Sequence, residues 1–464
     1  MSHPAFVSPD EIRSRFSDAM SRMYREEVPL YGELMDIVRT VNARVLADHP
    51  EAVSATEPDA DVARLSSERH GAIRVGTAEE LRLVRRAFAV MGMEPVGYYD
   101  LAAAGVPVHS TAFRPIAEEA LRRSAFRVFT SLLRLDLIED EALRETARAT
   151  LARRRICSEP AIALIERAER EGGLREADAA AFIEEVLKTF RWQSEALVDA
   201  PTYRQLSEAH RLIADVVSFR GPHINHLTPR TLDIDAAQAE MLARDIGAKA
   251  VIEGPPRRQV PILLRQTSFR AIEEKIRFQG DGEGAGGTHT ARFGEIEQRG
   301  VALTRKGRAL YDALLEQARQ PQEGSSGDYD ENLRRAFVAF PDTLEALRAG
   351  GLAYVRYAVT PKGLREGSGE GSLEDWLARG HVVAEPITYE DFLPVSAAGI
   401  FQSNLGDGTH QAYAASPERA AFEQALGIPV HDEFALYEAL SRASLAVVRE
   451  RLGHPASGAH EVHS

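Results

Sequence analysis

Apolar residues recur three and four positions apart near the start of the chain, which is the spacing of one face of a helix. The pattern predicts helices over residues 9–27 and 30–49. Ser8 followed by Pro9 marks the first start, because serine caps helices well and proline fits the first turn. The periodicity is lost over residues 51–61, which we interpret as a polar loop.

Further along, runs rich in β-branched and aromatic residues are typical of strands. Such a run predicts a strand over residues 126–135, and we also expect strands over residues 68–75, 250–254 and 260–265. Helical spacing returns over residues 203–217, for which we expect one continuous helix.

Strands and helices are mixed along the whole chain, which indicates an α+β fold in a single elaborated catalytic domain, residues 1–464. Residues 140–192 are rich in Ala, Glu and Arg at helical spacing, and we interpret them as a helical insertion. The Gly-rich residues 280–287 predict a flexible lid or hinge, and residues 453–464 a flexible tail.

Composition narrows the class of protein. The chain has 464 residues, 44% hydrophobic and 27% charged, as expected of a globular protein. Its net charge of -14 argues against nucleic acid or an anionic membrane as the main partner. There is no apolar signal region and no run long enough to span a bilayer, so a cytoplasmic location is our default expectation. The sequence does not indicate an oligomeric state.

Cysteine content limits the metal chemistry. Cys157 is the only cysteine, which excludes an intramolecular disulfide and sites built on several cysteines. Any metal must therefore be held by His, Asp and Glu.

The first candidate ligand lies on the strand predicted over residues 68–75. His70, Ala72 and Arg74 share one face of that strand, and small Ala72 leaves room between the other two. Four residues of strand separate His70 and Arg74 by ~13 Å. A metal on His70 and the guanidinium of Arg74 would then suit the two ends of a short dicarboxylate. Taken singly, a buried structural histidine and a surface ion pair explain these residues more simply.

The other candidates lie in two later stretches. His223 and His226 are three residues apart, and we expect only one of them to be a ligand and the other to support it. Glu295 and Glu297 share one face of a strand, which is costly for an internal strand without a cation or an arginine partner. An edge strand with two solvated acids is the simpler alternative.

Two histidines and one carboxylate suit ferrous iron and dioxygen, but the same ligands also suit catalytic zinc. The spacing therefore leaves a zinc-type metallohydrolase, or a metal-dependent isomerase or lyase, as the alternative to an oxygenase. A metabolite-binding protein without catalysis is a third possibility. No zinc-protease, dinucleotide-binding, Walker or nucleophile-elbow motif is present.

Several of these stretches together resemble one known family, the 2-oxoadipate dioxygenase/decarboxylases, also called hydroxyglutarate synthases. The resemblance is carried by residues 69–74 (RHGAIR), 221–230 (GPHINHLTPR), 292–300 (RFGEIEQRG), 303–308 (LTRKGR) and 393–401 (LPVSAAGIF). These stretches span most of the chain.

The resemblance implies a fold of the vicinal-oxygen-chelate type, in which a curved β-sheet, a half-barrel wrapped by helices, holds Fe(II). It implies that His70, His226 and Glu295 are the ligands, with Glu295 chosen over Glu297 by its position in the motif. Arg74 would bind the substrate carboxylate. Val395 and Ser396 would line the substrate pocket.

The resemblance also implies the reaction. 2-Oxoadipate and dioxygen would give (R)-2-hydroxyglutarate and carbon dioxide, with both oxygen atoms entering the products and no separate 2-oxoglutarate cosubstrate. It further implies a place in lysine catabolism.

Overall fold

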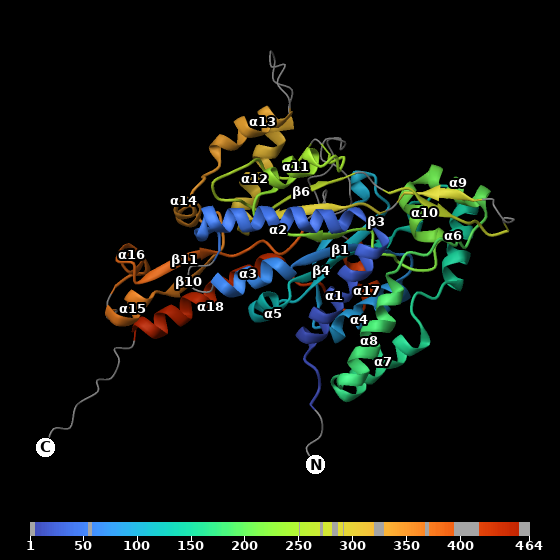
Figure 1. Ribbon diagram of the computed structural model, residues 1–464, viewed down its shortest axis with the longest axis horizontal. Helices are drawn as coiled ribbons and strands as arrows, with labels where there is room; N and C mark the ends of the chain where they lie inside the picture. Colours follow the sequence, from blue (N-terminus) through green and yellow to red (C-terminus); the bar gives the residue numbers. More distant parts are fainter. Residues whose placement is uncertain are drawn as a thin grey trace.

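The computed structural model describes residues 5–53, 58–249, 251–269, 272–280, 286–290, 292–319, 329–366, 371–393 and 417–453. Helices and strands are mixed along these segments, and Figure 1 shows helices around a central group of strands, with further strands toward both ends of the molecule. The mixed α+β class expected from the sequence is confirmed. The predicted tail lies outside the described residues except for Gly453, which ends the last helix, and so does most of the Gly-rich loop.

The N-terminal half supplies helices α1 (Pro9–Glu27), α2 (Leu30–Asp48), α3 (Pro58–Ser67), α4 (Ala78–Val90), α5 (Glu118–Arg123), α6 (Glu141–Arg153), α7 (Glu159–Glu171), α8 (Glu176–Thr189), α9 (Ala200–Ala209) and α10 (Arg211–Ser218). The C-terminal half supplies α11 (Ile234–Ala243), α12 (Arg305–Arg319), α13 (Tyr329–Ala336), α14 (Leu344–Ala349), α15 (Pro361–Glu366), α16 (Leu373–Ala378), α17 (Pro417–Leu426) and α18 (Glu433–Gly453). The start of α1 is as predicted, because the Ser8 side chain accepts from the backbone N–H of Glu11 at 3.2 Å.

The strands are β1 (Arg69–Val75), β2 (Glu94–Asp100), β3 (Val108–Arg114), β4 (Phe126–Leu133), β5 (Leu227–Pro229), β6 (Leu264–Ser268), β7 (Glu274–Ile276), β8 (Gly287–His289), β9 (Glu295–Arg299), β10 (Val355–Val359) and β11 (Val382–Pro386). Within the described residues the largest sheet has the order β2-β3-β4-β1-β5. β1 pairs with β4 in parallel and with β5 antiparallel. β6 and β9 form a separate antiparallel pair.

The main sheet and the β6–β9 pair meet at the end of β5. The backbone N–H of Thr231 donates to the carbonyl of Glu297 at 2.7 Å, and the backbone of Arg230 forms an isolated β-bridge with that of Glu297. β1, β5 and β9 therefore lie next to one another, although they come from distant parts of the sequence. This junction positions the candidate site.

β1 alternates between two hydrophobic clusters, as a strand buried on both faces must. Ile73 and Val75 pack in the cluster that includes side chains of α1, α2, α4 and α8. Ala72 faces the second cluster, with Leu263 and Tyr311. His70 and Arg74 share the face of Ala72, as the alternation of the strand predicts.

Two predictions about local structure are wrong. The loop expected over residues 51–61 contains the start of α3, whose few apolar residues hid a helix that begins with Pro58 and carries Asp59 and Asp61 in its first turn. The single helix expected over residues 203–217 is two helices, because His210 takes an extended conformation and its ring accepts from the backbone N–H of Leu212.

The strands expected over residues 250–254 and 260–265 are also misplaced. The described residues of the first make only an isolated bridge, from Glu253 to Gln266. The second begins at Leu264, since Leu263 has a positive φ of 53° and Pro261 has no N–H to donate. β6 therefore runs to Ser268 and brings Gln266 beside β9.

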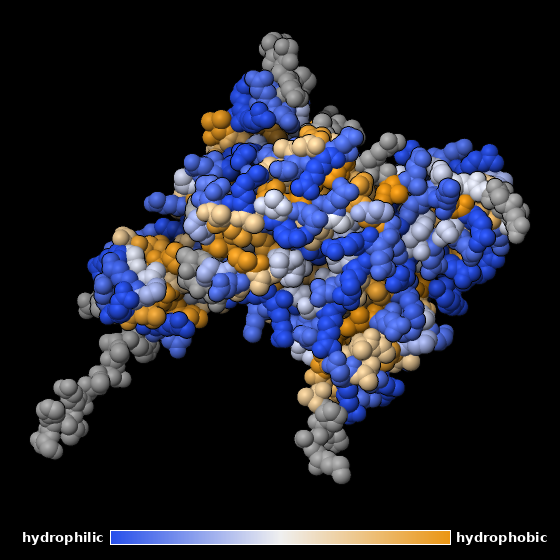
Figure 2. All heavy atoms as spheres, viewed as in Figure 1, coloured by the Kyte–Doolittle hydropathy of each residue, from blue (hydrophilic) through white to orange (hydrophobic). Residues whose placement is uncertain are grey.

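Residues 140–192 are helical as predicted and form α6, α7 and α8. Side chains of α7 and α8 belong to the same hydrophobic cluster as α1 and α4, so these helices share the main core. None of the described helices is long and apolar enough to cross a membrane. On the face drawn in Figure 2, hydrophilic residues predominate and hydrophobic ones form scattered patches between them.

Candidate metal centre

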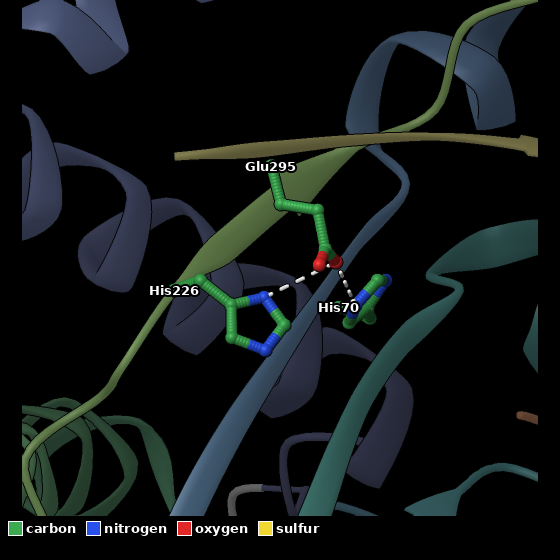
Figure 3. Close-up of side chains that lie close together, drawn as sticks. All are labelled: His70, His226 and Glu295. Atoms are coloured by element: carbon green, nitrogen blue, oxygen red, sulfur yellow. Dashed lines mark ion pairs between the residues drawn. The ribbon is translucent and has the colours of Figure 1, made fainter. Parts of the chain in front are cut away.

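Three buried side chains converge where β1, β5 and β9 meet: His70 from β1, His226 from the residue before β5, and Glu295 from the start of β9. Figure 3 shows the Glu295 carboxylate directed at both imidazole rings. The three residues each offer a ligand atom, and these atoms lie within 4.8 Å of one another. The side chains predicted from three distant stretches are therefore brought together.

The distances define a tight group. Glu295 Oε1 lies 3.1 Å from Nε2 of His70 and 3.4 Å from Nδ1 of His226. The two imidazole rings cross edge to face, with centroids 5.1 Å apart. None of the three side chains is more than 7% exposed. These side chains would therefore shield a bound cation from bulk water.

Thr228 determines which nitrogen of His226 is free to bind a metal. The Thr228 hydroxyl donates to Glu295 Oε1 at 3.0 Å and lies 2.9 Å from Nδ1 of His226. A hydroxyl has only one hydrogen, so it accepts from Nδ1–H, and this assigns the tautomer. Nε2 of His226 then keeps its lone pair.

The protonation states also fit a cation. Burial lowers the pKa of His226 to about 4, so the ring is neutral near pH 7. Burial raises the pKa of Glu295, but His226, His70 and Thr228 outweigh it, and the net pKa is lowered. A neutral histidine and an ionised carboxylate are the forms that bind metals.

His70 gives the clearest test of whether a cation fits. Burial lowers its pKa, but Glu297 and Glu295 outweigh burial and raise it above the ordinary value. Neither ring nitrogen is aligned for a hydrogen bond with any described residue, although both lie close to carboxylates. The group is therefore stable only with a proton or a metal cation between His70 and Glu295. The residues fit a divalent metal.

Glu297 contacts the opposite side of the His70 ring. Its Oε2 lies 2.9 Å from Nδ1 of His70, and both of its oxygens accept from Arg299, at 2.9 and 3.0 Å. Burial raises the pKa of Glu297, but Arg299 and His70 lower it to about 2. An ionised Glu297 beside Nδ1 of His70 favours a proton on that nitrogen, which leaves Nε2, facing Glu295, as the nitrogen that would bind a metal. This separates the two acids: Glu295 lies where a metal would bind, and Glu297 orients His70.

Behind Glu297 lies a buried network of charges. Glu68 has no exposed side-chain surface, and it pairs with Arg64 at 3.1 Å, Arg127 at 2.8 Å and Arg230 at 3.0 Å. Glu390 accepts from Arg64 and Arg127. The network fixes the strand ends that carry the candidate ligands.

Arg74 and His223 belong to a second buried group. Arg74 donates to Oδ2 of Asp215 at 2.7 Å, while His223 and His289 approach Oδ1 at 3.1 and 2.9 Å. His223 is thus not part of the group around Glu295, and the expectation that only one of the two histidines is a ligand stays a prediction. Val395 and Ser396 lie outside the described residues.

Sequence reasoning gave no role to several residues that the structure places here. Thr228 and Gln266 both donate to Glu295 Oε1, at 3.0 and 2.9 Å. Asp215 and His289 hold Arg74 and His223. One signal was available, since Asp215 is the only charged residue in an apolar run over residues 212–219, and a buried charge needs partners.

Glu297→Gln is expected to weaken divalent-metal binding about 10- to 100-fold, the usual cost of losing a partner that orients a ligand. The amide would no longer hold the Nδ1 proton of His70 with a full negative charge. Competition with a chromophoric chelator measures the metal affinity. Glu385→Gln, at a buried glutamate of β11 paired with Arg356 of β10, is the matched control and should leave the affinity unchanged. Equal affinity in Glu297→Gln and the unaltered chain would contradict the orienting role.

Comparisons with known proteins identify close relatives. The family model for 2-oxoadipate dioxygenase/decarboxylase matches residues 16–404. The chain is 56% identical over 455 residues to the 2-oxoadipate dioxygenase/decarboxylase of Pseudomonas putida, covering 96% of this chain and 98% of the relative. It is also 56% identical over 435 residues to the enzyme of the same name from Escherichia coli, covering 93% and 96%.

A solved structure agrees with these relatives. The crystal structure of the hydroxyglutarate synthase of Pseudomonas putida in complex with 2-oxoadipate superposes with a TM-score of 0.90 at 55% identity. The match covers 97% of this chain and 99% of that one.

Proposed function

The chain belongs to the 2-oxoadipate dioxygenase/decarboxylase family, and on that premise we propose that His70, His226 and Glu295 hold a catalytic Fe(II) and that Arg74 binds the substrate. The activity is the oxidative decarboxylation and hydroxylation of 2-oxoadipate to 2-hydroxyglutarate. The (R) configuration of the product and a role in lysine breakdown belong to the proposal. We also propose that the sheet is of the vicinal-oxygen-chelate type, its curve formed where β5 meets β9.

One observation supports this assignment best. His70 and Glu295 lie close together, yet neither ring nitrogen of His70 is aligned for a hydrogen bond with a described residue. Two neutral-histidine nitrogens and one carboxylate are a donor set that Fe(II) accepts. Fe(II) held in this way supplies open coordination positions for a 2-oxo acid and dioxygen, and with them the redox chemistry of the reaction.

The residues of the chain contribute binding and orientation. Glu297 and Thr228 fix the proton on Nδ1 of each histidine, so that both Nε2 atoms stay available. Gln266 and Thr228 donate to Oε1 of Glu295, which restrains the carboxylate. Phe392, packed edge to face on His70 at 5.0 Å, and Phe293, stacked on His226 at 4.9 Å, limit the access of water to the rings.

Arg74 is suited to the far end of the substrate. It lies on the same face of β1 as His70, ~13 Å away along the strand, and its guanidinium offers a planar fork that matches a carboxylate. A 2-oxo acid with its keto end at the metal would place a second carboxylate toward Arg74. This explains why a dicarboxylate is the substrate.

Oxygen uptake tests the proposal. The Fe(II)-loaded enzyme is expected to consume dioxygen with 2-oxoadipate, in a one-to-one ratio to carbon dioxide released, and to consume little with glutarate, which has no keto group. Turnover of 2-oxoadipate by metal-stripped protein, or under strictly anaerobic conditions, would contradict it and would favour the hydrolase, isomerase or lyase alternative.

A further inference from the structure

The second buried group extends along β1 from the metal centre. The segment before β5 runs antiparallel to β1, since His70 pairs with Thr228 and the backbone N–H of Asn225 donates to the carbonyl of Ala72 at 2.9 Å. His226 therefore lies beside His70, and His223 lies toward Arg74. Each of the two segments carries one residue of the metal group and one residue of the second group.

Asp215 is the centre of the second group. Its carboxylate is only 5% exposed. Arg74 donates to Oδ2, Nε2 of His289 lies 2.9 Å from Oδ1, and Nε2 of His223 lies 3.1 Å from Oδ1 without being aligned for a hydrogen bond. The hydroxyl of Tyr203 lies 2.7 Å from Nδ1 of His289, on the far side of that ring. Residues from β1, α10, β8 and the segment before β5 thus meet at one carboxylate, and Tyr203 of α9 contacts it only through His289.

Arg74 keeps most of its donors. Among the described residues Asp215 is the only acceptor of its guanidinium, and one N–H is used. Arginine has five N–H donors in a fixed plane, so an anchored Arg74 can still present a fork to a carboxylate. A free arginine side chain would lose more conformational entropy on binding than one already held.

We infer that Asp215, braced by His223 and His289, is a positioning residue that holds Arg74 for the distal carboxylate of the substrate and so sets the preference for dicarboxylic over monocarboxylic 2-oxo acids. The inference rests on the proposed function, because it takes Arg74 as the carboxylate-binding residue. The same three residues also offer ligand atoms close enough for a metal. The contacts favour the positioning role, because both nitrogens of His289 already have partners and Arg74 already neutralises Asp215.

Asp215→Asn tests this with two substrates that differ only at the far end, 2-oxoadipate and 2-oxohexanoate. The asparagine keeps the shape and one acceptor but loses the charge that holds Arg74. We expect kcat/KM for 2-oxoadipate to fall about 10- to 100-fold, mainly through KM, with little change for 2-oxohexanoate. Asp136→Asn, at an exposed aspartate paired with Arg134, is the control and should change neither. An equal loss on both substrates would overturn the inference, because it would mean a general structural role.

Two further variants keep the test decisive. In Arg74→Lys, adding Asp215→Asn should cost no further selectivity, because the two residues act as a unit. Tyr203→Phe removes only the hydroxyl of a partly buried side chain, and it should shift the substrate preference in the same direction by about two- to tenfold. If Asp215→Asn does not fold, the test rests on Tyr203→Phe and Arg74→Lys. An unchanged preference for 2-oxoadipate over 2-oxohexanoate in both variants would overturn the inference.

Binding measured without turnover separates this inference from the proposed function. Calorimetry of the Fe(II)-loaded protein under anaerobic conditions should give a lower Kd for 2-oxoadipate than for 2-oxohexanoate, and Asp215→Asn should remove the difference. If this holds while oxygen uptake fails, the reaction is wrong and the positioning role stands. Equal Kd values in the unaltered protein would overturn the positioning role alone. Binding of a second metal equivalent that Asp215→Asn loses would also overturn it, in favour of a second metal site.

Discussion

His70→Ala is expected to abolish stoichiometric Fe(II) binding and to lower oxygen uptake with 2-oxoadipate by more than about 100-fold, the upper range for losing even an orienting partner. His70 contributes the nitrogen that faces Glu295 at 3.1 Å, and its loss leaves Glu295 and His226 as an incomplete ligand pair. Metal content after gel filtration and an oxygen-electrode trace measure the two effects.

The control is His431→Ala, at a half-exposed histidine paired with Glu94 on the surface. It removes the same side chain and should change neither metal content nor oxygen uptake. A His70→Ala protein that keeps one equivalent of Fe(II) and full activity would contradict the assignment of the metal centre.

Glu68→Gln is expected to lower the free energy of unfolding by about 3–5 kcal/mol, the usual cost of removing one partner from a buried ion network. The carboxylate of Glu68 is fully buried and is approached by Arg64, Arg127, Arg230 and Arg299. Glutamine keeps the shape, but the four guanidiniums are then left with fewer buried negative charges. Burial raises the pKa of Glu68, but these arginines lower it well below its ordinary value, so the charge is present near pH 7.

Urea denaturation measures the change. Glu145→Gln makes the same substitution in an exposed pair with Arg148, and it should cost less than about 1 kcal/mol. A Glu68→Gln protein as stable as Glu145→Gln would contradict the view that the buried charges hold the ends of β1 and β5 together.

The elements around the site could largely be predicted from the sequence. β1 and β4 are buried on both faces, and the dense β-branched and aromatic content of β4 predicts a strand. The start of α4 can also be predicted from the sequence, since Thr77 caps the helix by accepting from the backbone N–H of Glu80. These signals lie in neighbouring residues, so the elements can be predicted from the sequence without knowledge of the fold.

Other features depend on contacts between distant residues. The break at His210 has no proline or glycine to mark it, and only the extended backbone of that residue reveals it. Glu295 and Glu297 are equivalent in the strand pattern, and they differ because Arg299 and Nδ1 of His70 engage Glu297 while Thr228 and Gln266 engage Glu295. The role of Asp215 required its partners from β1 and β8.

The most direct test of the metal assignment is a crystal structure of the enzyme with Fe(II) and 2-oxoadipate, grown without oxygen and measured at the iron absorption edge. We predict one anomalous peak bound by His70, His226 and Glu295, with the 2-oxo acid end of the substrate at the metal and its far carboxylate on Arg74. A peak between Asp215, His223 and His289 with none at Glu295, or a substrate bound away from both groups, would contradict the assignment.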